Sequence, residues 1–390
     1  MAVGLAELGV LHPVPGLRLA AVAAGIKKAE RLDVVVFELA PGSTSAGVFT
    51  TNAFCAAPVQ IARKHLAAAA PGLFLINTGN ANAGTGEPGL QAALDCCTGL
   101  AEAAGVVLET VLPFSTGVIG EPLPVAKIRA VAATALATLD ANAWPQAAVG
   151  IMTTDTLPKG CSRKLRLAGQ DIVITGIAKG AGMIRPDMAT MLAFIATDLD
   201  MAQHNVARSV RRNAERSFNR VTVDGDTSTN DACMLIATGH SGLQYEQLSQ
   251  ADKALFDGAL EEVFVTLAQA IIRDGEGATK FVTVRVDEGA GSAECLAVAY
   301  AIAESPLVKT ALFASDPNWG RILAAVGRAG VRDLDIAAVE VFLDDVCIVR
   351  GGARAVDYSE AAGQAVVSKE EFSIRVVLGR GVFSEEVWTC

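Results

Sequence analysis

The pattern of hydrophobic and polar positions predicts a chain in which strands and helices alternate. Strands are predicted at 34–37, 47–50, 74–76, 148–152, 171–178, 191–196, 281–286, 338–343 and 372–378. Helices are predicted at 89–105, 125–139, 205–217 and 250–273. The pattern indicates an α/β fold class with large, layered sheets, and strand alternation increases past residue 277. We therefore expect a domain boundary near residue 280.

Composition and charge favour a globular protein that does not bind nucleic acid. Hydrophobic residues make up 51% of the 390 positions and charged residues 19%, so the chain can bury a large core. The formal net charge is −10, which disfavours a phosphate-binding surface. Arg208, Arg211 and Arg212 form the one dense basic group, and we interpret them as the solvated face of a helix.

Membrane, secretion and metal-binding signals are weak. The early apolar stretches are interrupted at residues 25–28 and at Pro71, well short of the roughly 20 apolar residues of a spanning helix. Pro13 and Pro15 break the N-terminal segment, so we expect a cytoplasmic protein without a signal peptide. Eight cysteines without a C-x-x-C pair indicate free thiols, and four scattered histidines predict no metal site.

Generic catalytic motifs contribute little. The sequence contains no phosphate-binding G-x-x-x-x-G-K-[ST] loop and no G-x-S-x-G turn. A Ser-His-Asp triad stays possible, because spatial proximity is not visible in one sequence, but the four histidines give it little support.

One segment carries a specific signature. Residues 177–198, with Lys179, the glycines at 180 and 182, and Thr190, resemble the signature of the ornithine acetyltransferases, which are bifunctional glutamate N-acetyltransferases of arginine biosynthesis. Further segments are similar in the same order along the chain. They are 77–84, 114–120, 153–156, 223–231, 274–280 and 315–321.

The resemblance implies a layered αββα-type sandwich, related to an aminopeptidase-like superfamily, with a smaller C-terminal α/β domain. It also implies self-cleavage between Ala189 and Thr190. The chain would then divide into an α segment, 1–189, and a β segment whose part 190–280 completes the catalytic core and whose part 281–390 forms the C-terminal domain.

Thr190 is the nucleophile that the resemblance implies. A threonine hydroxyl is a poor nucleophile and needs a base. At a new N-terminus its own α-amino group, with an ordinary pKa of about 7.7–8.0, supplies that base. The small Ala189 leaves room for the hydroxyl to attack the preceding carbonyl. From the residues alone, Thr190 would be interpreted as a packed strand residue.

The resemblance assigns five further positions. Thr116 and Gly117 correspond to the oxyanion hole, with a hydroxyl and a backbone N–H as donors. Thr154, Lys179 and Glu276 correspond to substrate contacts, which suits amino-acid substrates that carry carboxylate and ammonium groups. Local sequence alone would make Thr116 and Gly117 a turn after a strand, and would make Lys179 and Glu276 ordinary loop residues.

The implied reaction moves an acetyl group from N-acetylornithine to Thr190 and then to glutamate. No cofactor is implied, acetyl-CoA is an additional candidate donor, and the cleaved segments are expected to assemble as an α2β2 heterotetramer. The family's C-terminal tail, which supplies an asparagine and a threonine to the substrate site, has no counterpart after Cys390. Two interpretations stay open: the sequence is truncated there, or the protein has lost part of its site, in which case we expect weaker substrate binding. Two alternatives stay open: an amidase or aminopeptidase of the same architecture, and a non-catalytic small-molecule binding protein.

Overall fold

The computed structural model describes residues 2–185 and 191–390. The chain divides into two compact units. The larger unit comprises Ala6–Asn219 and Asp226–Ile271, and the smaller unit comprises Met1–Leu5, Arg220–Gly225 and Ile272–Cys390. The strands that precede and follow the predicted cleavage site in the sequence belong to the larger unit.

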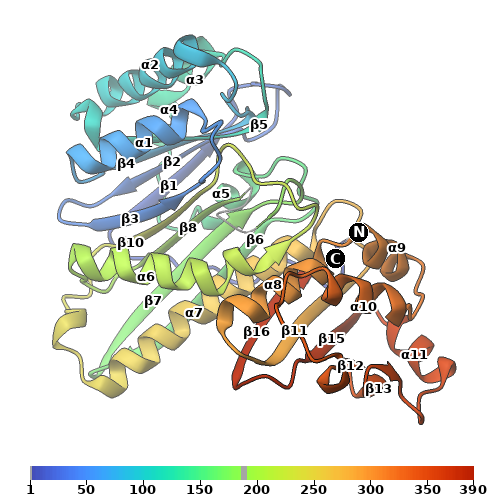
Figure 1. The fold of residues 1–390 in the computed structure, drawn as a ribbon. Helices are drawn as coiled ribbons and strands as arrows, with labels where there is room; N and C mark the ends of the chain where they lie inside the picture. The colour runs from blue at the N-terminus through green and yellow to red at the C-terminus, as the bar shows by residue number, and fades with distance from the viewer. Residues whose placement is uncertain (1, 186–190) are drawn as a thin grey trace. The chain divides into compact units, whose positions relative to one another are not determined.

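Two sheets form the centre of the larger unit (Figure 1). The first has the order β1-β2-β4-β5, and the second has the order β3-β10-β8-β7-β6. The first sheet consists of β1 Leu17–Val22, β2 Val34–Leu39, β4 Leu73–Asn80 and β5 Val111–Val118. The second sheet consists of β3 Thr44–Phe49, β10 Ala232–Ala237, β8 Leu192–Thr197, β7 Gln170–Lys179 and β6 Lys159–Leu167.

Side-chain alternation explains why the two sheets stack. On β2, Val35 and Phe37 belong to the core that both sheets share, whereas Val34 and Val36 pack with the outer helices. Phe194 of β8 enters the same shared core from the second sheet. Its ring centroid lies 5.2 Å from that of Phe37 and 5.1 Å from that of Phe114. These aromatic side chains fill the space between the sheets, which requires apolar residues from both.

Helices cover the outer faces of both sheets (Figure 1). The helices α2, α3 and α4 pack on the first sheet. The helices α6 and α7 lie on the outer side of the second sheet. The bounds are α1 Ala57–Ala68, α2 Gly86–Ala104, α3 Val125–Ala130, α4 Ala132–Ala137, α5 Trp144–Gly150, α6 Gln203–Arg216 and α7 Gln250–Arg273. This order of layers is the predicted αββα sandwich.

The smaller unit has its own sheet and its own core. Its strand order is β14-β13-β12-β15-β11-β16-β9. The strands are β9 Val221–Thr222, β11 Phe281–Gly289, β12 Glu340–Leu343, β13 Val346–Arg350, β14 Ala353–Arg354, β15 Glu371–Val377 and β16 Phe383–Thr389. The helices are α8 Ser292–Ala303, α9 Pro306–Phe313, α10 Trp319–Gly327 and α11 Glu360–Val367.

Most predicted elements are present, and one prediction is wrong. The apolar run 148–152 was expected to be a strand, but Trp144–Gly150 forms helix α5. Pro145 lies in the first turn of α5, where its fixed φ favours a helix start, and a short apolar run does not distinguish a buried helix from a buried strand. The expected helix at 125–139 divides into α3 and α4.

Two further expectations concern the surface and the thiols. Arg212 lies on the exposed face of α6 within 4 Å of the carboxylates of Asp257 and Glu261 on α7, which confirms the solvated basic face. All eight cysteines are free. Among the described residues, no single helix is long and apolar enough to cross a membrane, and α8 and α9 reach those values only as a pair bent by 56°.

Candidate active site

The end of β5 carries the two residues predicted to form the oxyanion hole. Thr116 is the last buried residue of β5, and Gly117, which follows it, is exposed. Gly117 has φ +136°, and a β-carbon there would lie 2.3 Å from the carbonyl carbon of Gly79 and 2.5 Å from the nitrogen of Asn80. Glycine is therefore required where the chain leaves β5 against the end of β4.

Lys179, the last residue of β7, meets Thr116 from the facing sheet. Its side chain is buried, with 3% of the residue exposed. Its Nζ donates a hydrogen bond of 2.9 Å to Oγ1 of Thr116. Since the threonine oxygen accepts this bond, its own hydroxyl hydrogen stays available for a second acceptor. A charged donor also polarises the hydroxyl and strengthens the bond that it donates.

Hydrogen bonds of two asparagine side chains and one serine hydroxyl hold the backbone next to Thr116. The Nδ2 atom of Asn230 donates to the carbonyl oxygens of Ala81, at 2.6 Å, and Ser115, at 2.9 Å. The hydroxyl of Ser115 donates to Oδ1 of Asn77 at 2.6 Å. These bonds tie the end of β5 to the loops that follow β4 and precede β10, so the direction of Thr116 is fixed by buried polar contacts.

Asp155 is a buried carboxylate beside Lys179. Its Oδ1 accepts from Nζ of Lys159 at 2.6 Å and from the backbone N–H of Gly180 at 2.7 Å. Burial acts to raise the pKa of Asp155, but the charges of Lys159 and Lys179 and the hydrogen bonds outweigh it and lower the pKa to about 2. Asp155 is therefore ionised, and it anchors the chain directly after Lys179.

The start of β8 lies between these groups. Leu192, its first residue, pairs with Lys179 of β7 on one side and with Ala232 of β10 on the other. Met191 precedes the strand, and its N–H donates to Oδ1 of Asp231 at 2.9 Å. At the start of β8, the chain therefore has Lys179 of β7 on one side and Asp231, the residue before β10, on the other.

Six of the seven predicted residues fall into three groups. Thr116, Gly117 and Lys179 lie together in the larger unit. Thr154 is exposed in the turn beside Asp155, whose Oδ2 accepts from the N–H of Thr153. Ala189 and Thr190 lie outside the described residues.

Glu276 is separate from this group, because it belongs to the smaller unit and is exposed there. It lines a cavity of about 260 Å³ together with Lys309, Thr310, Phe313 and Cys390. The Nζ of Lys309 donates to Oγ1 of Thr389 and to the carbonyl oxygen of Cys390, both at 2.8 Å. Opposite charges therefore line one cavity, which suits an amino-acid ligand.

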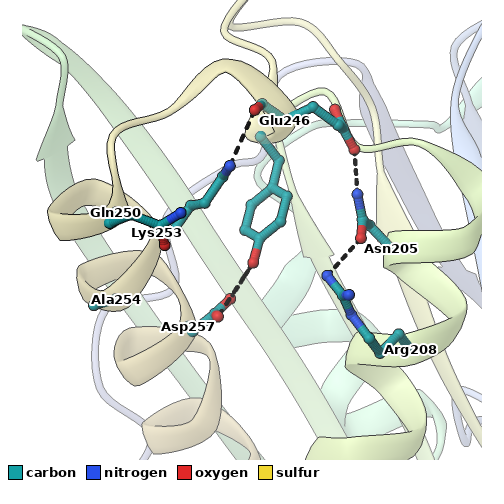
Figure 2. A pocket seen from close by; sticks show the side chains of 8 residues that line it. Asn205, Arg208, Glu246, Gln250, Lys253, Ala254 and Asp257 are labelled. Atoms are coloured by element: carbon teal, nitrogen blue, oxygen red, sulfur yellow. Dashed lines mark hydrogen bonds between the residues drawn. The ribbon is translucent and has the colours of Figure 1, made fainter.

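A second cavity, of about 440 Å³, opens between α6 and the start of α7 (Figure 2). Its polar side chains already bond to their neighbours: the hydroxyl of Tyr245 to Asp257, the guanidinium of Arg208 to Asn205, and Nζ of Lys253 to the carbonyl oxygen of Glu246. The cavity contains none of the residues predicted to act in the reaction.

Sequence reasoning assigned no role to three side chains that shape the site: Asp155, Asn230 and Asp231. Each lies inside a segment that contributed to the resemblance, at 153–156 or 223–231. Its place in that segment was the only feature of the sequence that pointed to a role in the site. Asp155 accepts from Gly180, 25 positions away, and Asn230 donates to Ala81, 149 positions away, and no spacing rule predicts such contacts. Cys233 on β10 is also buried close by, but burial raises the pKa of its thiol, which disfavours a thiolate nucleophile.

The architecture and the site define an αββα protein with a hydroxyl, an ammonium and two carboxyl groups at adjoining strand ends. The chain is similar to two proteins called arginine biosynthesis bifunctional protein ArgJ. The one from Pseudomonas fluorescens is 59% identical, and the one from Psychrobacter arcticus is 53% identical. Each match covers 100% of this chain and 96% of the relative.

Two solved structures are also similar. ArgJ from Bacillus halodurans is 33% identical over 50% of this chain and 92% of that chain, with a TM-score of 0.47. Ornithine acetyltransferase from Mycobacterium tuberculosis, solved with ornithine, is 32% identical over 47% of this chain and 96% of that chain, with a TM-score of 0.40.

A sequence model of the ArgJ family matches residues 18–390, and the chain belongs to the ArgJ family. Membership confirms the resemblance described above. It also confirms the assignment as a bifunctional acetyltransferase enzyme of arginine biosynthesis.

The ionised Asp155 gives a pH-dependent prediction. Because its pKa falls from 3.8 to about 2 on folding, its stabilising contribution is complete above about pH 5 and is lost as the pH falls through the range from about 4 to 2. Asp155→Asn should lower the free energy of unfolding at pH 7 by about 3–5 kcal/mol, since it leaves a buried ammonium without its carboxylate.

Urea unfolding of both proteins at pH 7, 5, 4 and 3 measures this difference. Asp171→Asn is the control, because Asp171 pairs with Arg166 on the exposed surface, and it should change stability little at any pH. A difference between wild type and Asp155→Asn that does not shrink toward pH 3 would contradict the assignment.

Proposed function

We propose that the chain transfers the acetyl group of N-acetylornithine to glutamate through an acetyl ester on Thr190. In the first half-reaction, Oγ of Thr190 bonds to the acetyl carbon, the carbon–nitrogen bond of the amide breaks, and the amine of ornithine leaves with a proton. In the second, the amine of glutamate attacks the ester and the Thr190 hydroxyl is restored. The single observation that carries the proposal is the Lys179–Thr116 hydrogen bond beside the start of β8.

This bond suits acyl transfer because charge develops on the carbonyl oxygen in each half-reaction. The Thr116 hydroxyl and the Gly117 N–H are the proposed donors to that oxygen, and both belong to a segment fixed by buried contacts. Donors that need no reorganisation stabilise a transition state more than mobile ones. Lys179, behind Thr116, strengthens the hydroxyl donor and need not touch substrate to act.

Substrate recognition is assigned to the charged and polar residues that the family resemblance implies. Glu276 is proposed to hold a substrate ammonium, and Thr154 and Lys179 complete the polar contacts that the family resemblance implies. Acetyl-CoA is proposed as a second donor for glutamate. Self-cleavage between Ala189 and Thr190 creates the nucleophile, the segments 1–189 and 190–390 assemble as an α2β2 heterotetramer, and the enzyme acts in the cytoplasm.

The central test is Thr190→Ala, assayed by intact mass and by ornithine release. Wild type should give two fragments separated between Ala189 and Thr190. The variant should give one uncut chain without transferase activity, because the attacking oxygen is gone. Thr190→Ser keeps the hydroxyl and should retain cleavage and some turnover. An uncut wild-type chain that transfers acetyl groups at full rate would overturn the proposal, and an uncut, inactive one would favour a binding protein.

Removal of one oxyanion donor should lower kcat. Thr116→Ala deletes the hydroxyl and should reduce kcat by about 10²- to 10³-fold, in line with the loss of one such donor. Thr116→Ser keeps a hydroxyl that can accept from Lys179, so it serves as the matched control and should stay close to wild type. Steady-state kinetics with N-acetylornithine checks this, and a wild-type kcat in Thr116→Ala would show that the residue only forms a turn.

The charge of Glu276 should matter for substrate but not for processing. Glu276→Gln should lower kcat/KM for N-acetylornithine by about 10- to 150-fold, the range of a hydrogen bond to a charged group. Intact mass should still show full cleavage, because cleavage needs no substrate. Glu370→Gln changes another exposed glutamate of the smaller unit and should have no effect. Blocked cleavage with normal turnover of the processed fraction would refute the assigned role.

A further inference from the structure

Asp231 is a buried carboxyl group with no role in the proposed reaction, and its side chain contacts the residue that precedes β8. It is 1% exposed, and its Oδ1 accepts the N–H of Met191 at 2.9 Å. Met191 is itself 3% exposed, and its carbonyl oxygen accepts from the N–H of Ala232 at 3.2 Å. Asp231 and the residue after it therefore hold Met191 through both of its backbone polar groups.

This arrangement is unusual because Met191 precedes the strand. The residue pairs of β8 begin at Leu192, and a side chain, not a neighbouring strand, receives the Met191 N–H. The nitrogen in question is the one that joins Met191 to Thr190 in the sequence. A contact here sets the orientation of the first peptide group of the proposed β segment.

We infer that Asp231 is a positioning residue for the proposed threonine nucleophile, because its side chain fixes the peptide group that follows Thr190. The inference rests on the proposed function. Displacement of reacting groups by about 1 Å can cost on the order of 10²-fold in rate. An acceptor that locks this peptide group therefore contributes to both self-cleavage and acetyl transfer without touching substrate.

The geometry makes the carboxyl group a hydrogen-bond acceptor for Met191. Burial raises the pKa of Asp231 well above its usual value, although the Met191 N–H and the charge of Lys179 both act to lower it. An asparagine side chain offers a neutral carbonyl oxygen of the same shape, so it should replace the aspartate.

The same strand provides a matched control. Asp198 directly follows the other end of β8, is 4% exposed, and accepts the backbone N–H of Val173 at 2.9 Å. Burial also raises its pKa. Substitution of Asp198 thus removes an equivalent buried contact from the same sheet, at the end of β8 away from Thr190.

The experiment compares Asp231→Ala, Asp231→Asn, Asp198→Ala and wild type. Asp231→Ala should slow self-cleavage and lower kcat of the processed fraction by about 10- to 100-fold with little change in KM, as expected for lost positioning. Asp231→Asn should restore both to near wild type. Asp198→Ala should lower the melting temperature comparably and leave cleavage and kcat unchanged.

Selective 15N-methionine labelling gives a readout independent of activity. The chain has seven methionines, and Met191→Leu identifies the Met191 amide signal. This signal should move and exchange faster with solvent in Asp231→Ala but not in Asp231→Asn. Unchanged cleavage and kcat in Asp231→Ala, or equal losses in Asp231→Ala and Asp198→Ala, would overturn the inference. A wild type that neither cleaves nor transfers acetyl groups would instead overturn the proposed function, while the amide signal still reports whether Asp231 holds Met191.

Discussion

The arrangement of the site depends on one buried ammonium group, that of Lys179. A charge of this kind is stable inside a protein only when neighbouring groups compensate for lost water. Here Asp155 supplies an ionised carboxylate, and the Thr116 oxygen accepts a hydrogen bond from Nζ. The contacts that stabilise the Lys179 ammonium therefore join the end of β7 to the turn around residue 155 and to the end of β5, which lies in the other sheet.

The stacked sheets make this meeting possible. Phe194 of β8 contacts Phe37 and Phe114 of the first sheet, so the aromatic core fixes the distance between the two layers. The polar ends of β5 and β7 then face each other beyond the apolar core. Gly117 completes the geometry, because any side chain there would collide with the backbone at the end of β4. Packing sets the layer spacing, and the polar contacts set the direction of the donors.

Sequence patterns were sufficient for most of the fold and for part of the site. The β-forming residues of β2, the alternation on β7 and the long helix α7 follow directly from residue type. The prediction for α5 is wrong because a short apolar run suits either element. Thr116 and Lys179 were found by resemblance, and their direct contact was not expected. Asp231 could not be found in this way, since its role arises from the pairing of β8 with β10, over a separation of 40 residues.

The two carboxyl groups near Lys179 differ in charge for a physical reason. Asp155 interacts with two ammonium groups and accepts the N–H of Gly180, so it is ionised despite its burial. Asp231 is more deeply buried and interacts with Lys179 alone among the cations, so burial shifts it toward the neutral form. Lys179 therefore lies between one carboxyl group that is ionised and one whose charged form is disfavoured by burial, and it directs its ammonium at the Thr116 hydroxyl. A low-dielectric site with this charge balance favours the developing negative charge of an acyl-transfer transition state more than the neutral amide that precedes it.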